Sequence, residues 1–174
     1  MRFDADEYER FVRGRTPALL RSAYLLTGDQ HLAEDLVQEA LARTHHRWSG
    51  LHETGNAEAY TRRVMYHLQV SRWRRRRVAE SLSGDLPDVA VLGGDHASAT
   101  AVRLSLERAL RSLTPRQRAV IVLRYFEDRS ESDAADLLGV SIGTVKSLAF
   151  RALQRLRGFA PELTELVTTE GGGR

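Results

Sequence analysis

A run of arginines interleaved with aromatic residues occupies residues 60–77, which contain seven Arg and no acidic residue. Aromatic rings stack on unpaired bases and guanidinium groups bind phosphates, so the combination suits a groove for single-stranded nucleic acid. Tyr60, Tyr66 and Trp73 supply the rings. Helical spacing favours a core position for Tyr60 and a surface position for Trp73, within the arginine run.

A second pattern, residues 130–157, has the order of a short helix, a glycine turn and a longer basic helix. Ser130 and Ser141 are helix N-cap residues, and Gly139 permits the left-handed turn that ends the first helix. The pattern is that of a helix-turn-helix, whose second helix enters the major groove of DNA. The residues predicted to reach bases or phosphates are Lys146, Ser147, Phe150, Arg151 and Arg155.

Charges are segregated along the chain, although the formal net charge of the 174 residues is only +3. Residues 60–77 carry +7 and residues 103–159 carry +5, whereas residues 3–58 and 78–102 carry −4 each. Two basic blocks separated by an acidic stretch indicate two separate contacts with a polyanion.

The elements that carry these residues read as helices. Thr16-Pro17 combines an N-cap residue with Pro at the first helical position and predicts a helix that ends at Gly28. A further helix of about five turns is expected after Asp29, with one apolar face that reaches Trp48. No stretch of any length is typical of a β-strand.

The predicted fold class is all-α, with two small helical domains joined by a flexible linker. Residues 1–77 form the first domain and residues 103–158 form the second. Residues 78–102 lose helical periodicity and contain Gly and Pro, which is typical of a tether. The tail, residues 159–174, is expected to be disordered. Each half is small for an independent hydrophobic core.

Several stretches, in chain order, resemble regions 2 and 4 of bacterial sigma factors. Residues 33–40 resemble region 2.2, residues 59–77 resemble regions 2.3 and 2.4, and residues 113–127 together with 141–147 resemble region 4. With only a linker between them, the chain is similar to the extracytoplasmic-function (group 4) sigma factors. The residue pattern within 59–77 resembles that of the SigE-like actinobacterial branch of the group.

This resemblance implies a sigma region 2 bundle and a sigma region 4 helix-turn-helix in a promoter-recognition subunit of RNA polymerase, not an enzyme. Such a subunit directs core polymerase to promoters through −10 and −35 contacts and assists promoter melting. Asp35, Gln38 and Glu39 would meet the β′ clamp helices, and the second domain would sit on the β flap and present its basic helix to the −35 element. The implied −10 contacts are Arg62, Arg63, His67, Arg72, Trp73, Arg74, Arg75, Arg76 and Arg77.

Two residues depart from the pattern of the family. His67 stands where many members carry an Asn that captures a flipped base, and an imidazole lacks the paired donor and acceptor of an amide. Leu148 stands where relatives often have Arg or Gln, which removes one contact with DNA. The consensus promoters of the family therefore do not transfer to this chain.

Two other classes of protein remain open on the residues alone. A one-component repressor or activator would use the same helix-turn-helix, but it would need a ligand or dimerisation domain beside it. An enzyme or metal protein is disfavoured because the chain has no Cys, no H-E-x-x-H and no P-loop, and His45 and His46 point to different helix faces. No catalytic residue, cofactor or metal site is predicted.

The remaining expectations concern location and partners. The apolar runs are too short for a membrane span and the N-terminus is too acidic for a signal peptide, so we expect a cytoplasmic protein without membrane insertion. Members of the group are usually held by an anti-sigma factor, a partner that no residue of this sequence identifies.

Overall fold

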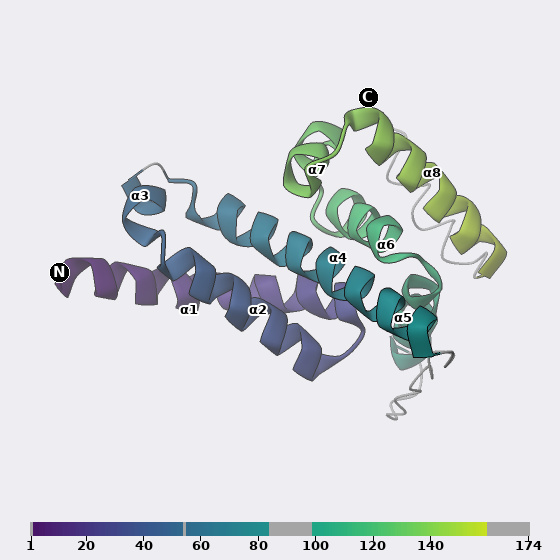
Figure 1. Ribbon diagram of the computed structural model, residues 1–174, viewed down its shortest axis with the longest axis horizontal. Helices are drawn as coiled ribbons and strands as arrows, with labels where there is room; N and C mark the ends of the chain where they lie inside the picture. Colours follow the sequence, from purple (N-terminus) through teal and green to yellow (C-terminus); the bar gives the residue numbers. More distant parts are fainter. Residues whose placement is uncertain (1, 54, 84–98, 160–174) are drawn as a thin grey trace.

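The computed structural model describes residues 2–53, 55–83 and 99–159, and over these ranges the regular elements are all helices (Figure 1). The first half contains α1 (Arg2–Thr27), α2 (Gln30–His45), α3 (Trp48–Glu53) and α4 (Ala57–Ser83). The second half contains α5 (Ala99–Ser112), α6 (Pro115–Ile121), the π-helix η1 (Val122–Phe126), α7 (Glu131–Leu138) and α8 (Ile142–Phe159). The predicted all-α fold is confirmed.

Helix α1 is longer than the sequence pattern predicted, because it runs without a break through Pro17. Proline normally opens a helix, since it lacks an N–H and crowds the preceding turn. Here Phe11 and Val12 before the proline and Leu19 after it pack into the same core. The predicted helix start at Thr16-Pro17 is therefore wrong, because burial on both sides of Pro17 outweighs one lost hydrogen bond. The predicted end is confirmed, as Gly28 follows the helix with a φ of 71°.

Helix α2 begins where predicted and ends before Trp48. The Asp29 side chain accepts a hydrogen bond from the backbone N–H of Leu32 at 2.9 Å, which caps the helix. Trp48 belongs to the separate short helix α3, where its ring lies 5.1 Å from that of Tyr8 and 5.2 Å from that of Phe11, measured between centroids. The predicted single helix of about five turns is thus two helices, α2 and α3. The ring of Trp48 packs α3 against Tyr8 and Phe11 of α1.

Helix α4 continues beyond the predicted start of the linker. It reaches Ser83, so residues 78–83 extend the helix that carries the arginine run. Residues 84–98 of the predicted linker and the tail from residue 160 lie outside the described residues. Residues 99–102, also assigned to the linker, belong to α5, so the second helical half begins four residues earlier than predicted.

The predicted helix-turn-helix is present as α7 and α8. The Ser130 hydroxyl accepts from the backbone N–H of Asp133, whose carboxylate accepts from the backbone N–H of Ser130 in return, a capping box. Gly139 ends α7 with a φ of 65°, in the left-handed region that glycine adopts without strain. Ser141 then accepts from the N–H of Thr144 at 3.1 Å and caps α8.

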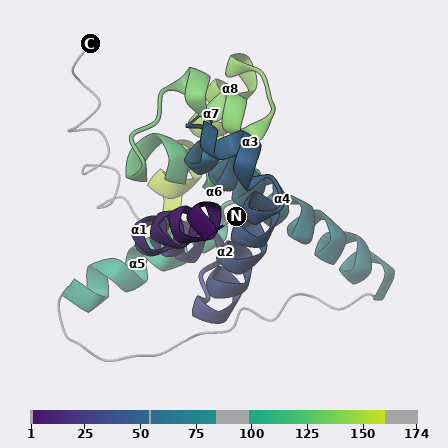
Figure 2. The same cartoon turned by 90° about the vertical axis from the view of Figure 1, so that its left-hand side faces the viewer.

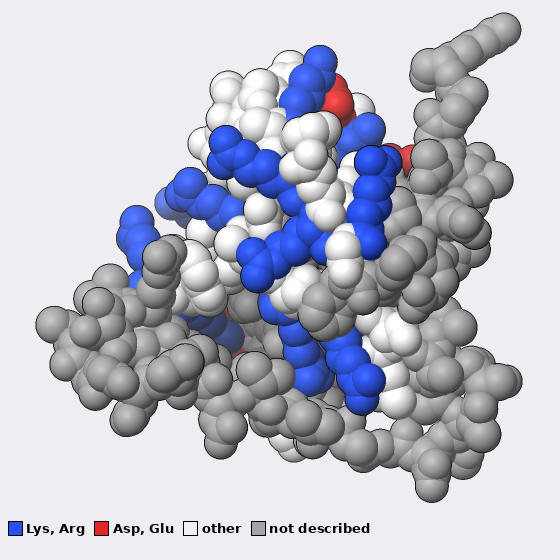
Figure 3. All heavy atoms as spheres, turned by 90° about the vertical axis from the view of Figure 1, so that its right-hand side faces the viewer, with Lys and Arg blue, Asp and Glu red and all other residues white. Residues whose placement is uncertain are grey.

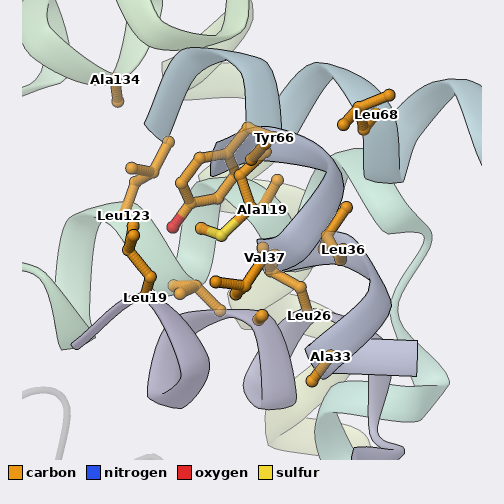
Figure 4. Packing of buried hydrophobic residues seen from close by; sticks show 14 of the residues in the cluster. Leu19, Leu26, Ala33, Leu36, Val37, Tyr66, Leu68, Ala119, Leu123 and Ala134 are labelled. Atoms are coloured by element: carbon orange, nitrogen blue, oxygen red, sulfur yellow. The ribbon is translucent and has the colours of Figure 1, made fainter. Parts of the chain in front are cut away.

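The two halves share the larger of two hydrophobic clusters, which the sequence did not predict. Figures 1 and 2 show α1 and α2 on one side of α4, and α6, α7 and α8 on the other. The main cluster joins Leu19, Leu36 and Tyr66 of the first half to Leu123 and Val145 of the second. Figure 4 shows the Tyr66 ring pointing into this cluster. Each half is small for an independent core, and the two halves bury apolar residues against each other instead.

We expect Leu36→Ala to lower the free energy of unfolding by about 2–5 kcal/mol, because the Leu36 side chain is 0% exposed and its loss leaves a cavity. Urea unfolding followed by circular dichroism measures the change. The control is Ile142→Ala, a truncation at a side chain that is 45% exposed, for which we expect a change within about 0.5 kcal/mol. Equal losses for both variants would contradict this account of the core.

Candidate nucleic-acid interface

Helix α8 is amphipathic, and its outer face carries the residues that the sequence predicted for DNA. Val145 and Ala152 are fully buried and Leu156 nearly so, which fixes the rotation of the helix. Phe150 is 61% exposed, an unusual position for a ring that packs against nothing in the core. The exposed residues of this face include Lys146, Ser147, Phe150, Arg151 and Arg155.

The polar contacts on this face are weak. Lys146 Nζ lies 3.5 Å from Glu131 Oε2, an exposed ion pair of the kind that stabilises little. Ser147 Oγ donates to the carbonyl of Thr144 at 3.0 Å within the same helix. Leu148, the departure from the family pattern, is half-buried and packs against the shared core. These side chains are therefore free to exchange their partners for DNA, whereas Leu148 stabilises the fold.

The distal part of the arginine run also faces solvent. Arg74 and Arg75 are exposed on α4, and Trp73 beside them is half-buried. Arg76 and Arg77 belong to the same helix, and their side chains lie outside those described. Two of the arginines predicted to contact the −10 element, Arg74 and Arg75, are thus exposed near the end of α4.

Two residues of the run are buried instead of exposed, which corrects their predicted placement. Arg62 is 8% exposed and Tyr66 is 0% exposed. Arg62 Nη1 donates to Glu127 Oε1 at 2.6 Å, and the Tyr66 hydroxyl donates to the same oxygen at 3.1 Å. Burial, together with the Glu127 carboxylate, raises the pKa of Tyr66 well above its usual value. Tyr66 is thus a neutral core residue and offers no face for base stacking.

The other proximal residues of the run contact the second half of the chain or the turn between α2 and α3. Arg63 Nη2 donates to the carbonyl of Asp136 in α7 at 2.7 Å. The His67 ring lies 3.6 Å from where a Cβ would stand on Gly139, in the turn of the helix-turn-helix. Tyr60 is half-buried, with the Arg47 guanidinium 5.8 Å from its ring centroid.

The residues predicted to bind polymerase lie together on α2. Asp35 and Gln38 are exposed, whereas Glu39 is half-buried and accepts from Arg43 at 2.7 Å and from Arg72 at 2.6 Å. The hydrogen bond from Arg72 lowers the pKa of Glu39, to which Arg43 also contributes. Glu39, a predicted polymerase contact, is therefore hydrogen-bonded to Arg72, a predicted DNA contact.

An arginine-rich cleft of about 820 Å³ separates the end of α4 from the second half, and we call it the arginine cleft. The charged residues that line it are Asp35, Arg72, Arg75, Arg111, Arg118 and Arg155. Figure 3 shows Lys and Arg side chains gathered on this face, with few acidic ones among them.

Arg118 forms the floor of the arginine cleft and joins the two halves. Its guanidinium donates to the carbonyls of Leu110 at 2.7 Å and of Leu26 at 2.8 Å. Burial, followed by the charge of Arg111, lowers the pKa of Arg118 to about 10, so it remains a cation at neutral pH. Sequence reasoning missed Arg111 and Arg118 as part of this surface, because only the fold brings α5 and α6 beside α4.

Within the residues that the structure describes, no group of three or more His, Asp or Glu side chains is placed to hold a metal ion. None of the described helices combines the length and the apolar character needed to cross a membrane.

The fold and these surfaces define an all-helical protein with two basic surfaces and a helix-turn-helix. The model of sigma-70 region 2 matches residues 11–78, and that of sigma-70 region 4 matches residues 103–156. The RNA polymerase sigma-E factor of Streptomyces avermitilis is 46% identical over 151 residues, which cover 87% of this chain and 83% of the relative.

More distant relatives agree. The ECF RNA polymerase sigma factor SigE of Mycolicibacterium smegmatis is 32% identical, over 87% of this chain and 61% of the relative. The crystal structure of the sigma factor RpoE in complex with the anti-sigma factor NepR, from Bartonella quintana, superposes with a TM-score of 0.73 at 25% identity, over 90% of this chain and 98% of that one. The chain belongs to the extracytoplasmic-function sigma factors of RNA polymerase, which are transcription initiation factors.

We expect Arg72→Ala to raise the pKa of Glu39, because the hydrogen bond from Arg72 is the largest cause of its lowering. Since the folded-state pKa of Glu39 is depressed, its contribution to stability is present at neutral pH and is lost as the pH falls through that pKa. NMR titration of the Glu39 side chain measures the pKa. Arg43→Ala is the control and should give a smaller rise; an equal or larger rise would contradict the assignment.

Proposed function

We propose that the two halves of this sigma factor divide promoter recognition between them. Residues 1–77 act as region 2 on the core polymerase and the −10 element, residues 103–158 act as region 4 on the −35 element, and residues 78–102 link them. The exposed outer face of α8 is the observation that supports this division most directly. The 159–174 tail carries no assigned role.

Reading of the −35 element is assigned to the first turns of α8. Lys146 and Arg151 supply donors for the acceptor pair of guanine, and the exposed ring of Phe150 suits the methyl group of thymine. Ser147 can donate to either base edge. Arg155, one turn beyond Arg151, is placed for a phosphate, which fixes register and does not read sequence.

The −10 element is assigned to α4. Promoter opening needs a base to leave the stack, and a cationic groove with an aromatic face stabilises the unpaired strand. The half-buried Trp73 supplies the aromatic face, and the exposed Arg74 and Arg75 beside it supply the cations. The assignment extends to Arg63, Arg72, Arg76 and Arg77, and to His67 as the residue that meets a flipped base, but not to Arg62, which is buried.

Core polymerase is assigned to the acidic and amide face of α2. Asp35, Gln38 and Glu39 lie within little more than one helical turn, and a compact acidic face suits a basic helical partner such as the β′ clamp helices. The β flap is assigned to the second half. We infer that the protein acts in the cytoplasm and has no catalytic activity of its own. The complex formed by the Bartonella relative supports an anti-sigma factor as a further partner.

Transcription in vitro with purified core polymerase on genomic fragments tests the function and yields a cognate promoter. On that promoter we expect Lys146→Ala and Arg151→Ala each to cost about 1–3 kcal/mol of binding and to relax −35 discrimination. Gln154→Ala, an exposed truncation on the same helix, should leave discrimination unchanged. Equal losses on cognate and scrambled −35 sequences would contradict the assignment of α8.

We expect Asp35→Ala combined with Gln38→Ala to weaken association with core polymerase at least tenfold, because both side chains are exposed on the proposed contact face. Titration of labelled chain with core polymerase measures the affinity, and circular dichroism checks the fold. Glu34→Ala, a neighbouring acidic residue on α2, is the control. Wild-type affinity of the double variant would contradict the proposal.

A further inference from the structure

A second pocket, of about 520 Å³, lies between α4 and the second half of the chain. Helix α4 supplies one wall, and the other consists of the start of α6, the end of α7 with the turn after it, and part of α8. The pocket adjoins the arginine cleft, with which it shares Trp73 and Thr114. Its volume falls within the range of about 300–1,000 Å³ that is usual for small-molecule sites.

The walls of this pocket are apolar and are anchored in the fold. Leu138, Val140 and Leu148 line the pocket, are half-buried and also pack against the main hydrophobic cluster. The backbone N–H of Val140 donates to the carbonyl of Ala135 at 3.0 Å, which fixes the turn that carries two of these side chains. Trp73, also half-buried, adds an aromatic ring. Such walls are preformed, as is usual for a site that takes a small apolar ligand.

The side chains of fixed charge that line this pocket are arginines. Arg74 of α4 and Arg116 of α6 are both exposed. No Asp or Glu is among the described residues that line the pocket, and neither arginine is paired with an acidic side chain elsewhere in the described part of the chain. An anionic group in the pocket would therefore accept charge-assisted hydrogen bonds without displacing an existing ion pair.

The other polar groups of the pocket also donate hydrogen bonds. The Thr114 hydroxyl accepts from the backbone N–H of Gln117 at 3.3 Å, so its own proton is left to donate. Ser71 contributes a second hydroxyl, and His67 contributes an imidazole. Because these donors add to the guanidinium groups, the polar lining suits a ligand whose polar end is a hydrogen-bond acceptor.

We propose that this pocket is a binding site for a small amphipathic organic anion, with an aromatic or branched apolar body and one carboxylate or sulfonate group. The apolar body lies against Val140, Leu148 and the ring of Trp73, and the anionic group accepts from Arg74 and Arg116. Trp73 and Arg74 are also assigned to the −10 element, so a bound ligand would occupy side chains that the unpaired strand needs. This consequence rests on the proposed function of α4, whereas the site itself does not.

Anilinonaphthalene sulfonate is the probe, because it combines an aromatic body with a single negative charge and fluoresces more strongly in an apolar site. N-phenylnaphthylamine, which has the same ring system without the sulfonate, is the neutral control ligand. Both are titrated into the full chain, and we expect the sulfonate to saturate at one molecule per chain. Near-ultraviolet circular dichroism establishes that each protein has native packing, since a molten chain binds such dyes without a specific site.

Arg116→Gln tests the recognition of the anion. We expect it to bind the sulfonate probe about tenfold more weakly, because one charge-assisted hydrogen bond is lost, and the neutral probe as the wild type does. Arg108→Gln, at an exposed arginine of the same half that does not line the pocket, is the matched control and should bind both probes as the wild type does. Unchanged affinity of Arg116→Gln for the sulfonate, or equal weakening of both probes, would overturn the proposal.

Ser71→Phe tests the location of the site. Ser71 is half-buried on α4 and lines the pocket, so a phenyl ring there fills the space and binding of both probes should be lost. Ser132→Phe, at an exposed position of α7 outside the pocket, should leave binding unchanged. Wild-type binding by Ser71→Phe overturns the site, and if that variant does not fold, the exposed change Arg116→Gln still decides. DNA and polymerase are absent from these titrations, so their outcome is independent of the proposed function.

Discussion

Helix α4 has to satisfy neighbours on two sides, and the rest of the structure depends on how it does so. On one side Met65 and Leu68 pack in the core with residues of α1 and α2. On the other, Arg62 and Tyr66 meet the carboxylate of Glu127. Apolar side chains can shift slightly and still remain packed. A buried charged group must keep its hydrogen bonds, because a buried donor or acceptor without a partner costs free energy. The relative placement of the halves therefore follows from hydrogen-bond geometry as much as from apolar area.

The charge that suits this protein to DNA also opposes its compact arrangement. The stretches with net charges of +7 and +5 meet where the arginine cleft opens between the halves. Arg118 shows how the fold accommodates a cation there, since backbone carbonyls from both halves accept its hydrogen bonds. Salt screens repulsion between the exposed arginines, and a polyanion neutralises it. The charge that suits these surfaces to phosphate therefore also opposes the packing of the two halves where the basic stretches meet.

The features that sequence predicted correctly are local ones. Ser130, Gly139 and Ser141 act on residues within a turn, so their types were sufficient to place α7, its end and the start of α8. Arg62 was misplaced because its partner, Glu127, lies 65 residues away and no pattern near Arg62 reports it. Pro17 misled for a similar reason, since the core that keeps α1 continuous is assembled from other helices. Position in the fold, and not residue type, separates the buried from the exposed arginines of a single run.

The surfaces of α4 and α8 that are assigned to DNA differ in accessibility. The α8 face that we propose for the −35 element is exposed, and the major-groove edges that it would read are accessible without melting. Among the α4 residues that the sequence predicted for the −10 element, Arg62 is buried against Glu127, whereas Arg63 is exposed and donates to the carbonyl of Asp136. The surface assigned to duplex DNA is thus accessible in this arrangement. Arg62, in contrast, would have to exchange the carboxylate of Glu127 for a phosphate before it could contact an unpaired strand.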